Sequence, residues 1–191
     1  MNSRGDRSVP ATGSGARVGA HDGARARRAA PFDAVLATSF GKLGISTGDG
    51  ALAAISFLPD AAPPRAPATP LAQRACEQVE GYLRDPDFHF SVPLQRVGTP
   101  FQRRVWNAIA AIPRGRTRTY GDIARELGSA PRAVGQACGD NRFPLVIPCH
   151  RVVSASGVGG FAHGDDGYLL RIKRWLLAHE GAAVDTHRPR A

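Results

Sequence analysis

The sequence lacks the features that mark membrane proteins, disulfide-bonded secreted proteins and zinc-binding proteins. Its 191 residues contain no apolar run approaching the ~20 residues that a membrane span needs, so we expect a soluble protein with no membrane contact. Cysteine is scarce. The number of cysteines is odd, their spacing is irregular, and no two form a CxxC pair; they are Cys76, Cys138 and Cys149. This pattern argues against a disulfide framework and a zinc site, and it indicates a reduced, cytoplasmic protein.

Acidic residues are scarce in the second half of the chain, where basic residues gather. The formal net charge is +9, and ten arginines lie between Arg96 and Arg151 against only Asp122, Glu126 and Asp140. A charge run is most often a solvated face, but a basic excess beside a candidate nucleophile points to a polyanion such as DNA or RNA.

Large apolar side chains are almost absent from residues 1–30, which are rich in glycine, alanine, serine and arginine. Such a segment cannot bury enough surface to offset the entropy of ordering, so we expect a disordered basic tail. The composition of the remainder predicts an N-terminal α/β domain over residues 31–97, a C-terminal domain over residues 98–184 and a short tail over residues 185–191.

The predicted N-terminal domain begins with short apolar runs at residues 34–37, 43–46 and 52–58, which glycine turns separate. This pattern predicts a β-meander. Thr69-Pro70 is an N-cap followed by a first-turn proline, so a helix is expected to begin there. Residues 88–97 are expected to be extended.

The predicted C-terminal domain is mainly helical. Thr99-Pro100 begins one helix, and Thr119 can cap a second helix over residues 120–127. A turn and a short helix of small residues over 132–139 follow, which together give the outline of a helix-turn-helix. A glycine-rich loop over residues 154–166 and a last amphipathic helix complete the domain.

The candidate chemistry lies at Cys149 and His150, inside an apolar, β-branched run at residues 146–153 that we expect to be a strand. An imidazole beside a thiol is one of the few means of forming a thiolate near neutral pH. Pro148 holds Ile147 extended and removes a backbone donor just before the cysteine. A buried, inert cysteine beside a hydrogen-bonded histidine is nevertheless the commoner arrangement, so the surroundings must decide.

Those surroundings carry a family resemblance. The sequence PCHRV at residues 148–152 is preceded by RAVG at 132–135 and by Asn141, and it is followed by Gly160-Phe161 and by LLAHEG at 176–181. With these motifs the chain resembles the O6-alkylguanine-DNA alkyltransferases, also called methylated-DNA–protein-cysteine methyltransferases. The resemblance begins in the N-terminal half in outline and becomes dense after Thr99.

The resemblance implies a mixed α/β (α+β) fold, with a small ribonuclease H-like N-terminal domain and a winged helix-turn-helix-like alkyltransferase domain. Family members flip O6-alkylguanine, mainly O6-methylguanine, out of duplex DNA and transfer the alkyl group to their own cysteine. O4-methylthymine is a second candidate substrate. Because a thioether has no easy leaving group, we expect one reaction per molecule. The resemblance also implies a monomer of the bacterial cytoplasm that needs no cofactor.

The resemblance assigns roles to four catalytic residues. Cys149 accepts the alkyl group, and His150 acts as a general base through a water. Glu180 is expected to hold the His150 imidazole in its useful tautomer and to stabilise its charge. Asn141 is expected to tie the helix-turn-helix to the segment that carries Cys149.

The resemblance also assigns contacts with DNA and with the extruded base. Tyr120 is expected to crowd the phosphate beside the target, and Arg132 to fill the gap that the base leaves. Small residues let the second helix approach closely in the minor groove. The expected DNA-binding residues are Tyr120, Arg132, Ala133, Gly135 and Arg151. The expected pocket residues are Tyr120, Val152, Gly160 and Phe161.

The chain departs from the family pattern in two ways. The segment after Gly160-Phe161 is several residues longer and contains His163, Asp165 and Asp166, so the range of accepted alkyl groups stays open. These three residues are a weak metal candidate because they lack further ligands at fitting spacing. No cysteine lies between Met1 and Arg74, so we predict no structural metal in the N-terminal half.

Three other functions compete with alkyl transfer. A lesion-binding, alkyltransferase-like protein flips the base without repairing it, but such proteins carry another residue at the position of Cys149. A cysteine hydrolase using Cys149, His150 and Glu180 leaves Arg132 and the basic stretch unexplained. A sequence-specific transcription regulator leaves Cys149 without a task.

Overall fold

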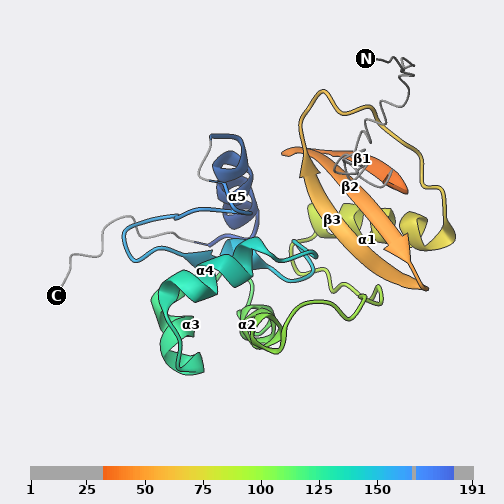
Figure 1. The fold of residues 1–191 in the computed structure, drawn as a ribbon. Coiled ribbons are helices and arrows are strands. Elements are labelled where there is room, and N and C mark those ends of the chain that lie inside the picture. The colour runs from red at the N-terminus through yellow and green to blue at the C-terminus, as the bar shows by residue number, and fades with distance from the viewer. Residues whose placement is uncertain (1–31, 165–166, 183–191) are drawn as a thin grey trace, which may run out of the picture. The chain divides into compact units, whose positions relative to one another are not determined.

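The computed structural model describes residues 32–164 and 167–182 (Figure 1). The predictions for the tails at residues 1–30 and 185–191, and for Asp165 and Asp166, lie outside these residues. Within the described ranges, no helix has both the length and the apolar character needed to cross a membrane.

The N-terminal half contains an antiparallel sheet of three strands, β1 (Ala34–Thr38), β2 (Gly41–Gly48) and β3 (Ala51–Leu58), in the order β1-β2-β3. Between β2 and β3 lie Asp49 and Gly50, which have φ angles of 51° and 71°. Two residues with positive φ give the backbone twist that a tight hairpin needs, and Asp-Gly adopts it readily. The predicted β-meander is confirmed.

Helix α1 (Pro70–Arg84) packs against this sheet and contacts all three strands (Figure 1). The Thr69 hydroxyl accepts a hydrogen bond from the Ala72 backbone at 3.0 Å, which satisfies one of the unpaired amides of the first turn. The segment at 88–97, which was predicted to be extended, forms no regular strand; Leu94 makes an isolated bridge with Leu52. Pro93 lacks a backbone donor and limits further pairing.

Two capping boxes define helices of the C-terminal half. Helix α2 (Pro100–Ala110) has Thr99 as its N-cap, and α3 (Tyr120–Leu127) has Thr119. In each case the threonine hydroxyl accepts a hydrogen bond from the backbone amide three positions later, and the side chain at that later position accepts one from the threonine amide. Gly128 ends α3 with a φ of 60°, a left-handed conformation that glycine adopts without strain. The predicted helix starts are therefore confirmed.

Helix α4 (Pro131–Gly139) follows the turn and packs against both α2 and α3. The indole of Trp106 on α2 donates a hydrogen bond to the Ala137 carbonyl at 2.7 Å. This buried bond fixes the helix-turn-helix pair on α2, because an indole N–H left unpaired in a core is costly.

The prediction of a strand at the cysteine is wrong. Cys149–Arg151 form a 3-10 turn, and only β5 (Val152–Val153) is a strand, paired in parallel with β4 (Arg118–Thr119). The turn closes through hydrogen bonds from the Cys149 amide to the Ile147 carbonyl and from the Arg151 amide to the Pro148 carbonyl. Pro148 cannot donate to a sheet, so the β-branched run turns before it can pair.

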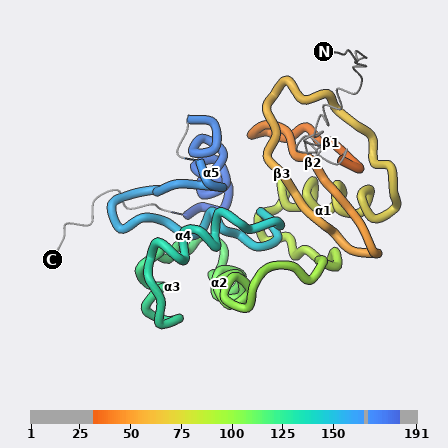
Figure 2. Tube along the Cα trace, in the orientation of Figure 1, coloured from red at the N-terminus to blue at the C-terminus, as the bar shows by residue number. Residues whose placement is uncertain are grey.

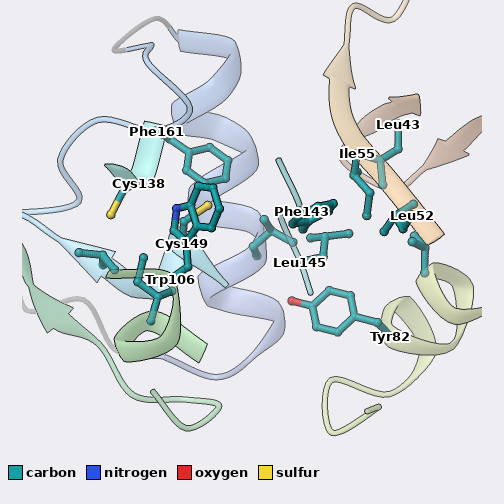
Figure 3. Close-up of a cluster of buried hydrophobic side chains, with 14 of the residues drawn as sticks. Leu43, Leu52, Ile55, Tyr82, Trp106, Cys138, Phe143, Leu145, Cys149 and Phe161 are labelled. Atoms are coloured by element: carbon teal, nitrogen blue, oxygen red, sulfur yellow. The ribbon is translucent and has the colours of Figure 1, made fainter. Parts of the chain in front are cut away.

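Most of the buried apolar side chains of the described residues form one cluster drawn from both halves. Figure 3 shows Leu43, Leu52 and Ile55 of the sheet near Phe143 and Leu145 of the C-terminal half. The last helix, α5 (Gly167–His179), closes the cluster with its own buried face. The boundary at residue 98 stays a prediction.

Candidate active site

Cys149 lies at the wall of a pocket between α4 and the loop that follows β5. The pocket has a volume of about 400 Å³, and the thiol residue itself is only 5% exposed. The trace in Figure 2 shows the loop running beside α4. The lining residues are Tyr120, Gly135, Gln136, Cys138, Gly139, Cys149, Gly160, Phe161, Ala162, His163 and Gly164.

The Cys149 side chain is protonated, as a thiol, near neutral pH. Burial raises its pKa, while a hydrogen bond with Asn141 and the charge of Lys173 lower it without reversing the effect. The resting protein therefore does not contain the preformed thiolate that the neighbouring histidine suggested in the sequence. The proton must leave when the reaction begins.

Lys173 is a buried cation close to this thiol. Its ammonium group donates hydrogen bonds to the carbonyls of Val152 at 2.7 Å and Gly160 at 2.9 Å. Burial lowers the pKa of Lys173 to about 8. The side chain thus joins β5 to the pocket loop and places a positive charge near Cys149.

His150 and Glu180 form a buried pair behind the cysteine. The imidazole Nε2 and the Glu180 Oε1 lie 2.8 Å apart, and both residues are almost fully buried. Burial lowers the pKa of His150 and outweighs the opposing effect of Glu180. The ring is therefore neutral at pH 7, with its Nε2 proton directed at the carboxylate.

The second ring nitrogen of His150, Nδ1, has no hydrogen-bond partner among the described residues. A neutral ring that donates from Nε2 carries an acceptor lone pair at Nδ1. The geometry thus presents a proton acceptor on the residue beside Cys149, and the described hydrogen bonds join neither ring nitrogen directly to the thiol.

Glu180 is charged and held by several donors. Arg151 donates from Nε to Oε2 at 2.8 Å and from Nη2 to Oε1 at 2.9 Å, and the Tyr82 hydroxyl donates to Oε1 at 2.9 Å. Burial alone would raise the pKa of this carboxyl, but the hydrogen bonds from His150 and Arg151 hold it well below its usual range. The carboxylate is therefore a fixed negative charge.

Asn141 joins the end of α4 to the cysteine segment. Its Nδ2 donates to the Ile147 carbonyl at 2.8 Å, and its Oδ1 accepts from the Phe143 amide at 3.0 Å. The same side chain lowers the pKa of the Cys149 thiol, although burial outweighs this effect. Asn141 thus ties the end of α4 to the segment that carries Cys149.

The N-terminus of α4 presents exposed and small residues. Arg132 is exposed and has no hydrogen bond or ion pair with any part of the chain that the structure describes. A Cβ atom added to Gly135 would meet nothing within 4 Å, so this helix face is open. Tyr120 lies at the pocket, where its hydroxyl donates to the Gly160 carbonyl at 3.1 Å.

Comparison with known proteins gives a family-model match in the C-terminal half and similar relatives. Residues 100–182 match the profile of the DNA-binding domain of 6-O-methylguanine DNA methyltransferase. A probable methylated-DNA–protein-cysteine methyltransferase of Acanthamoeba polyphaga mimivirus is 47% identical over 96 residues, 49% of this chain and 61% of that protein. The methylated-DNA–protein-cysteine methyltransferase of Methanosarcina acetivorans is 44% identical over 113 residues, 58% of this chain and 69% of that protein.

The crystal structure of Mycobacterium tuberculosis O6-methylguanine methyltransferase matches with a TM-score of 0.64 at 34% identity, covering 77% of this chain and 90% of that one. The chain belongs to the methylated-DNA–protein-cysteine methyltransferase family. A structure of Mycobacterium tuberculosis OGT in complex with DNA matches with the same TM-score and identity, over 76% of this chain and 90% of that one. The expected mixed α/β alkyltransferase fold is confirmed.

The positions of Arg151 and Val152 do not suit the roles that the sequence predicted for them. Arg151 was expected to bind DNA, but its side chain is only 13% exposed and donates to Glu180 and to the Ile112 carbonyl. The guanidinium of Arg151 therefore donates its hydrogen bonds to groups inside the protein. Val152 is fully buried and does not line the pocket; its carbonyl instead anchors Lys173.

Three buried residues near the site, Lys173, Tyr82 and Cys138, were not expected to be site residues from the sequence, and His163 was considered only as part of the longer loop and as a metal ligand. One signal for Lys173 was present, because it stands three and four positions before the buried Leu176 and Leu177 and so shares their helix face. No comparable signal marks Tyr82, which reads as an ordinary apolar position of α1.

Among the described residues, His163 does not belong to any group of side chains that could hold a metal ion. Within residues 32–164 and 167–182, no group of three or more His, Cys, Asp and Glu side chains is arranged to hold a metal ion. Its Nε2 instead lies 2.8 Å from an Asp140 carboxylate oxygen. Asp165 and Asp166 lie outside the described residues, so the metal hypothesis that included them is untested.

Proposed function

We propose that this protein repairs DNA by transferring the alkyl group of O6-alkylguanine, mainly O6-methylguanine, irreversibly to Cys149. The observation that carries the proposal is the Cys149 thiol at the pocket wall, with the buried His150 and Glu180 pair beside it, in a member of this family. The presence of the cysteine argues against a lesion-binding protein that leaves the alkyl group in place.

The thiol loses its proton as the substrate reacts. The proton passes from Cys149 Sγ through a water to Nδ1 of His150, and Glu180 stabilises the imidazolium that forms. Lys173 stabilises the sulfur anion by its charge. Asn141 holds the segment that carries Cys149 through its hydrogen bonds with Ile147 and Phe143.

The sulfur then attacks the alkyl carbon. A carbon–sulfur bond forms while the bond between that carbon and guanine O6 breaks, and the guanine anion that leaves takes up a proton. The product is a thioether, which offers no leaving group under mild conditions. Each molecule therefore reacts once, and the protein is consumed.

The target base reaches Cys149 by leaving the duplex. Unstacking and unpairing cost a few kcal/mol, which contacts elsewhere must offset. Arg132 fills the gap in the stack, and Tyr120 crowds the adjacent phosphate and lines the pocket with Gly160 and Phe161. Ala133 and Gly135 allow α4 to approach the floor of the minor groove, so binding is independent of sequence.

Duplex DNA is the partner, and the protein acts as a monomer in the bacterial cytoplasm. A relative of the same family has been crystallised in complex with DNA, and the basic stretch from Arg96 to Arg151 suits a phosphate backbone. All three cysteines are free, which fits a reducing compartment. O4-methylthymine is a second candidate substrate.

Intact-protein mass measurement after incubation with a duplex that carries O6-methylguanine tests the proposal. The wild-type protein should gain one methyl group on Cys149, the duplex should lose its lesion, and the Cys149→Ala variant should do neither. Cys76→Ala is the matched control and should react like the wild type, because Cys76 is packed in α1. Lesion removal by the Cys149→Ala variant would contradict the proposal, and tight binding without a mass change would favour the lesion-binding function.

A further inference from the structure

Tyr82 brings the N-terminal half of the chain to the proposed reaction centre. It lies on α1, is 2% exposed and donates from its hydroxyl to Glu180 Oε1 at 2.9 Å. Figure 3 shows the hydroxyl pointing away from α1 into the buried cluster. Tyr82 has no part in the proton transfer or the attack proposed above.

The backbone and ring of Tyr82 are also fixed next to Glu180. His179, the residue before Glu180, donates from Nε2 to the Tyr82 carbonyl at 2.8 Å. The Tyr82 ring meets the His179 ring edge-on at 5.2 Å and the Phe90 ring at 5.8 Å. The hydroxyl is thus held from several sides, so its direction does not depend on the bond to Glu180 alone.

The donors at Glu180 are distributed unequally. Among residues 32–164 and 167–182, Oε1 accepts from Tyr82, from His150 and from Arg151 Nη2, whereas Oε2 accepts only from Arg151 Nε. Hydrogen bonds to a carboxylate oxygen disperse its negative charge. Each further donor on Oε1 therefore weakens the pull of that oxygen on the His150 proton.

We propose that Tyr82 is a positioning residue for alkyl transfer: its hydroxyl fixes the Glu180 carboxylate and limits the negative charge that His150 experiences. The inference rests on the proposed function, because His150 must be neutral to accept the proton of Cys149. Tyr82 itself does not touch the substrate or the thiol.

Removing only the hydroxyl has two consequences. The carboxylate loses a restraint, so His150 is oriented less well and transfer slows. Oε1 also bears more charge, so the imidazolium is stabilised and His150 stays protonated to a higher pH. The charged and titratable groups that act on His150 are Glu180, Arg151 and Lys173, and those that act on Tyr82 are Glu180 and Arg151. The substitution leaves all of them in place.

The experiment compares Tyr82→Phe with wild type in single-turnover methyl transfer to Cys149 between about pH 4 and 9, a range that extends well below 6.5 because burial lowers the pKa of His150. Loss of a hydrogen bond to a charged group predicts a rate roughly tenfold lower at pH 7. The acid limb of the pH profile, where the rate falls because His150 becomes protonated, should move to higher pH. Tyr168→Phe is the matched control, because that hydroxyl bonds the Leu58 carbonyl and not Glu180; its rate and acid limb should equal those of the wild type.

The outcomes separate the inference from the proposed function. If the wild type transfers no methyl group, the proposed function fails. If the wild type reacts and Tyr82→Phe keeps the wild-type acid limb, the inference is overturned, whether or not the variant is slower or less stable. A purely structural role would lower the thermal midpoint and leave the acid limb where it was.

A second variant keeps the test decisive if Tyr82→Phe does not fold. Site-specific 3-fluorotyrosine at position 82 keeps the ring and the hydroxyl but makes the hydroxyl a stronger donor. The acid limb should then move to lower pH, opposite to the shift in Tyr82→Phe. An unmoved acid limb in this protein also overturns the inference.

Discussion

At the residue scale, the reactivity of Cys149 is a balance between burial and nearby charge. Burial opposes the thiolate, while Lys173 and Asn141 favour it, and burial is the larger effect. A protein that is consumed by its reaction gains from this balance, because a resting thiol is slow to react with other alkylating molecules. In the proposed mechanism, His150 and Lys173 act when the alkylated guanine is in place.

Replacing Lys173 with methionine should make the thiol harder to ionise. Methionine is similar in length but carries no charge, so the pKa of Cys149 should rise. We expect the rate of modification by iodoacetamide at pH 7, where Lys173 is still mostly charged, to fall roughly tenfold, equivalent to one pKa unit. The control is Lys42→Met, which removes the other lysine of the chain. An unchanged rate in Lys173→Met would show that the cation does not act on the thiol.

At the scale of elements, the pocket depends on how the loop after β5 meets α4. The Nε2 of His163 lies 2.8 Å from Asp140 at the end of α4, and a Cβ atom on Gly139 would come within 2.4 Å of the His163 ring. The close approach therefore requires glycine at that position. Both paired side chains are about half exposed, so their ion pair is worth at most about 1 kcal/mol.

The His163→Ala variant should accept bulkier alkyl groups more readily. The substitution removes part of the pocket wall and the tie between the loop and α4, so the pocket can widen. We expect the ratio of the transfer rates from O6-benzylguanine and O6-methylguanine in matched oligonucleotides to rise several-fold. His89→Ala, which removes an exposed histidine outside this pocket, is the control. A ratio equal to that of the wild type would mean that His163 does not limit the size of the alkyl group.

At the scale of the whole molecule, the buried Glu180 joins the two halves of the chain. Its carboxylate accepts from Tyr82 in the N-terminal half and from His150 and Arg151 in the C-terminal half. An unpaired charge in this place would be costly, so the donors must be present together. Stability and the proposed chemistry therefore depend on the same group.

This dependence predicts a loss of stability in acid. The folded protein holds the pKa of His150 below 6.5 and that of Glu180 below 4.5, their ordinary values. The unfolded chain therefore binds more protons as the pH falls, so the free energy of unfolding should decrease below about pH 6.5 and again below about pH 4.5. Denaturant titrations across this range measure it.

The Glu180→Gln variant provides the matched comparison for acid stability. It should lose about 3–5 kcal/mol near neutral pH, because the buried Arg151 loses its counter-charge, and the step below pH 4.5 should flatten. Glu126→Gln breaks an exposed pair with Arg118 and should change stability by at most about 1 kcal/mol. A step below pH 4.5 of the same size in the Glu180→Gln variant would assign it to other carboxyl groups.

Local patterns were sufficient to predict the helix starts and the meander. Each helix start depends on residues within four positions of one another: a threonine cap followed by proline, or a cap whose backbone amide bonds the side chain three positions later. Such a pattern can be recognised in the sequence without knowledge of the fold. The motifs around Cys149 were likewise sufficient to indicate the family. These features depend on neighbours in the chain.

Tertiary structure alone decided the state of the site. The run at residues 146–153 has the composition of a strand, yet Pro148 and the hydrogen bonds around it form a 3-10 turn. Burial decided that Cys149 rests as a thiol and that Arg151 is bound to Glu180 and not available to DNA. The contact of Tyr82 with Glu180 spans 98 positions of the chain. Desolvation and long-range hydrogen bonds depend on which segments pack together, and that information is absent from any local pattern of residues.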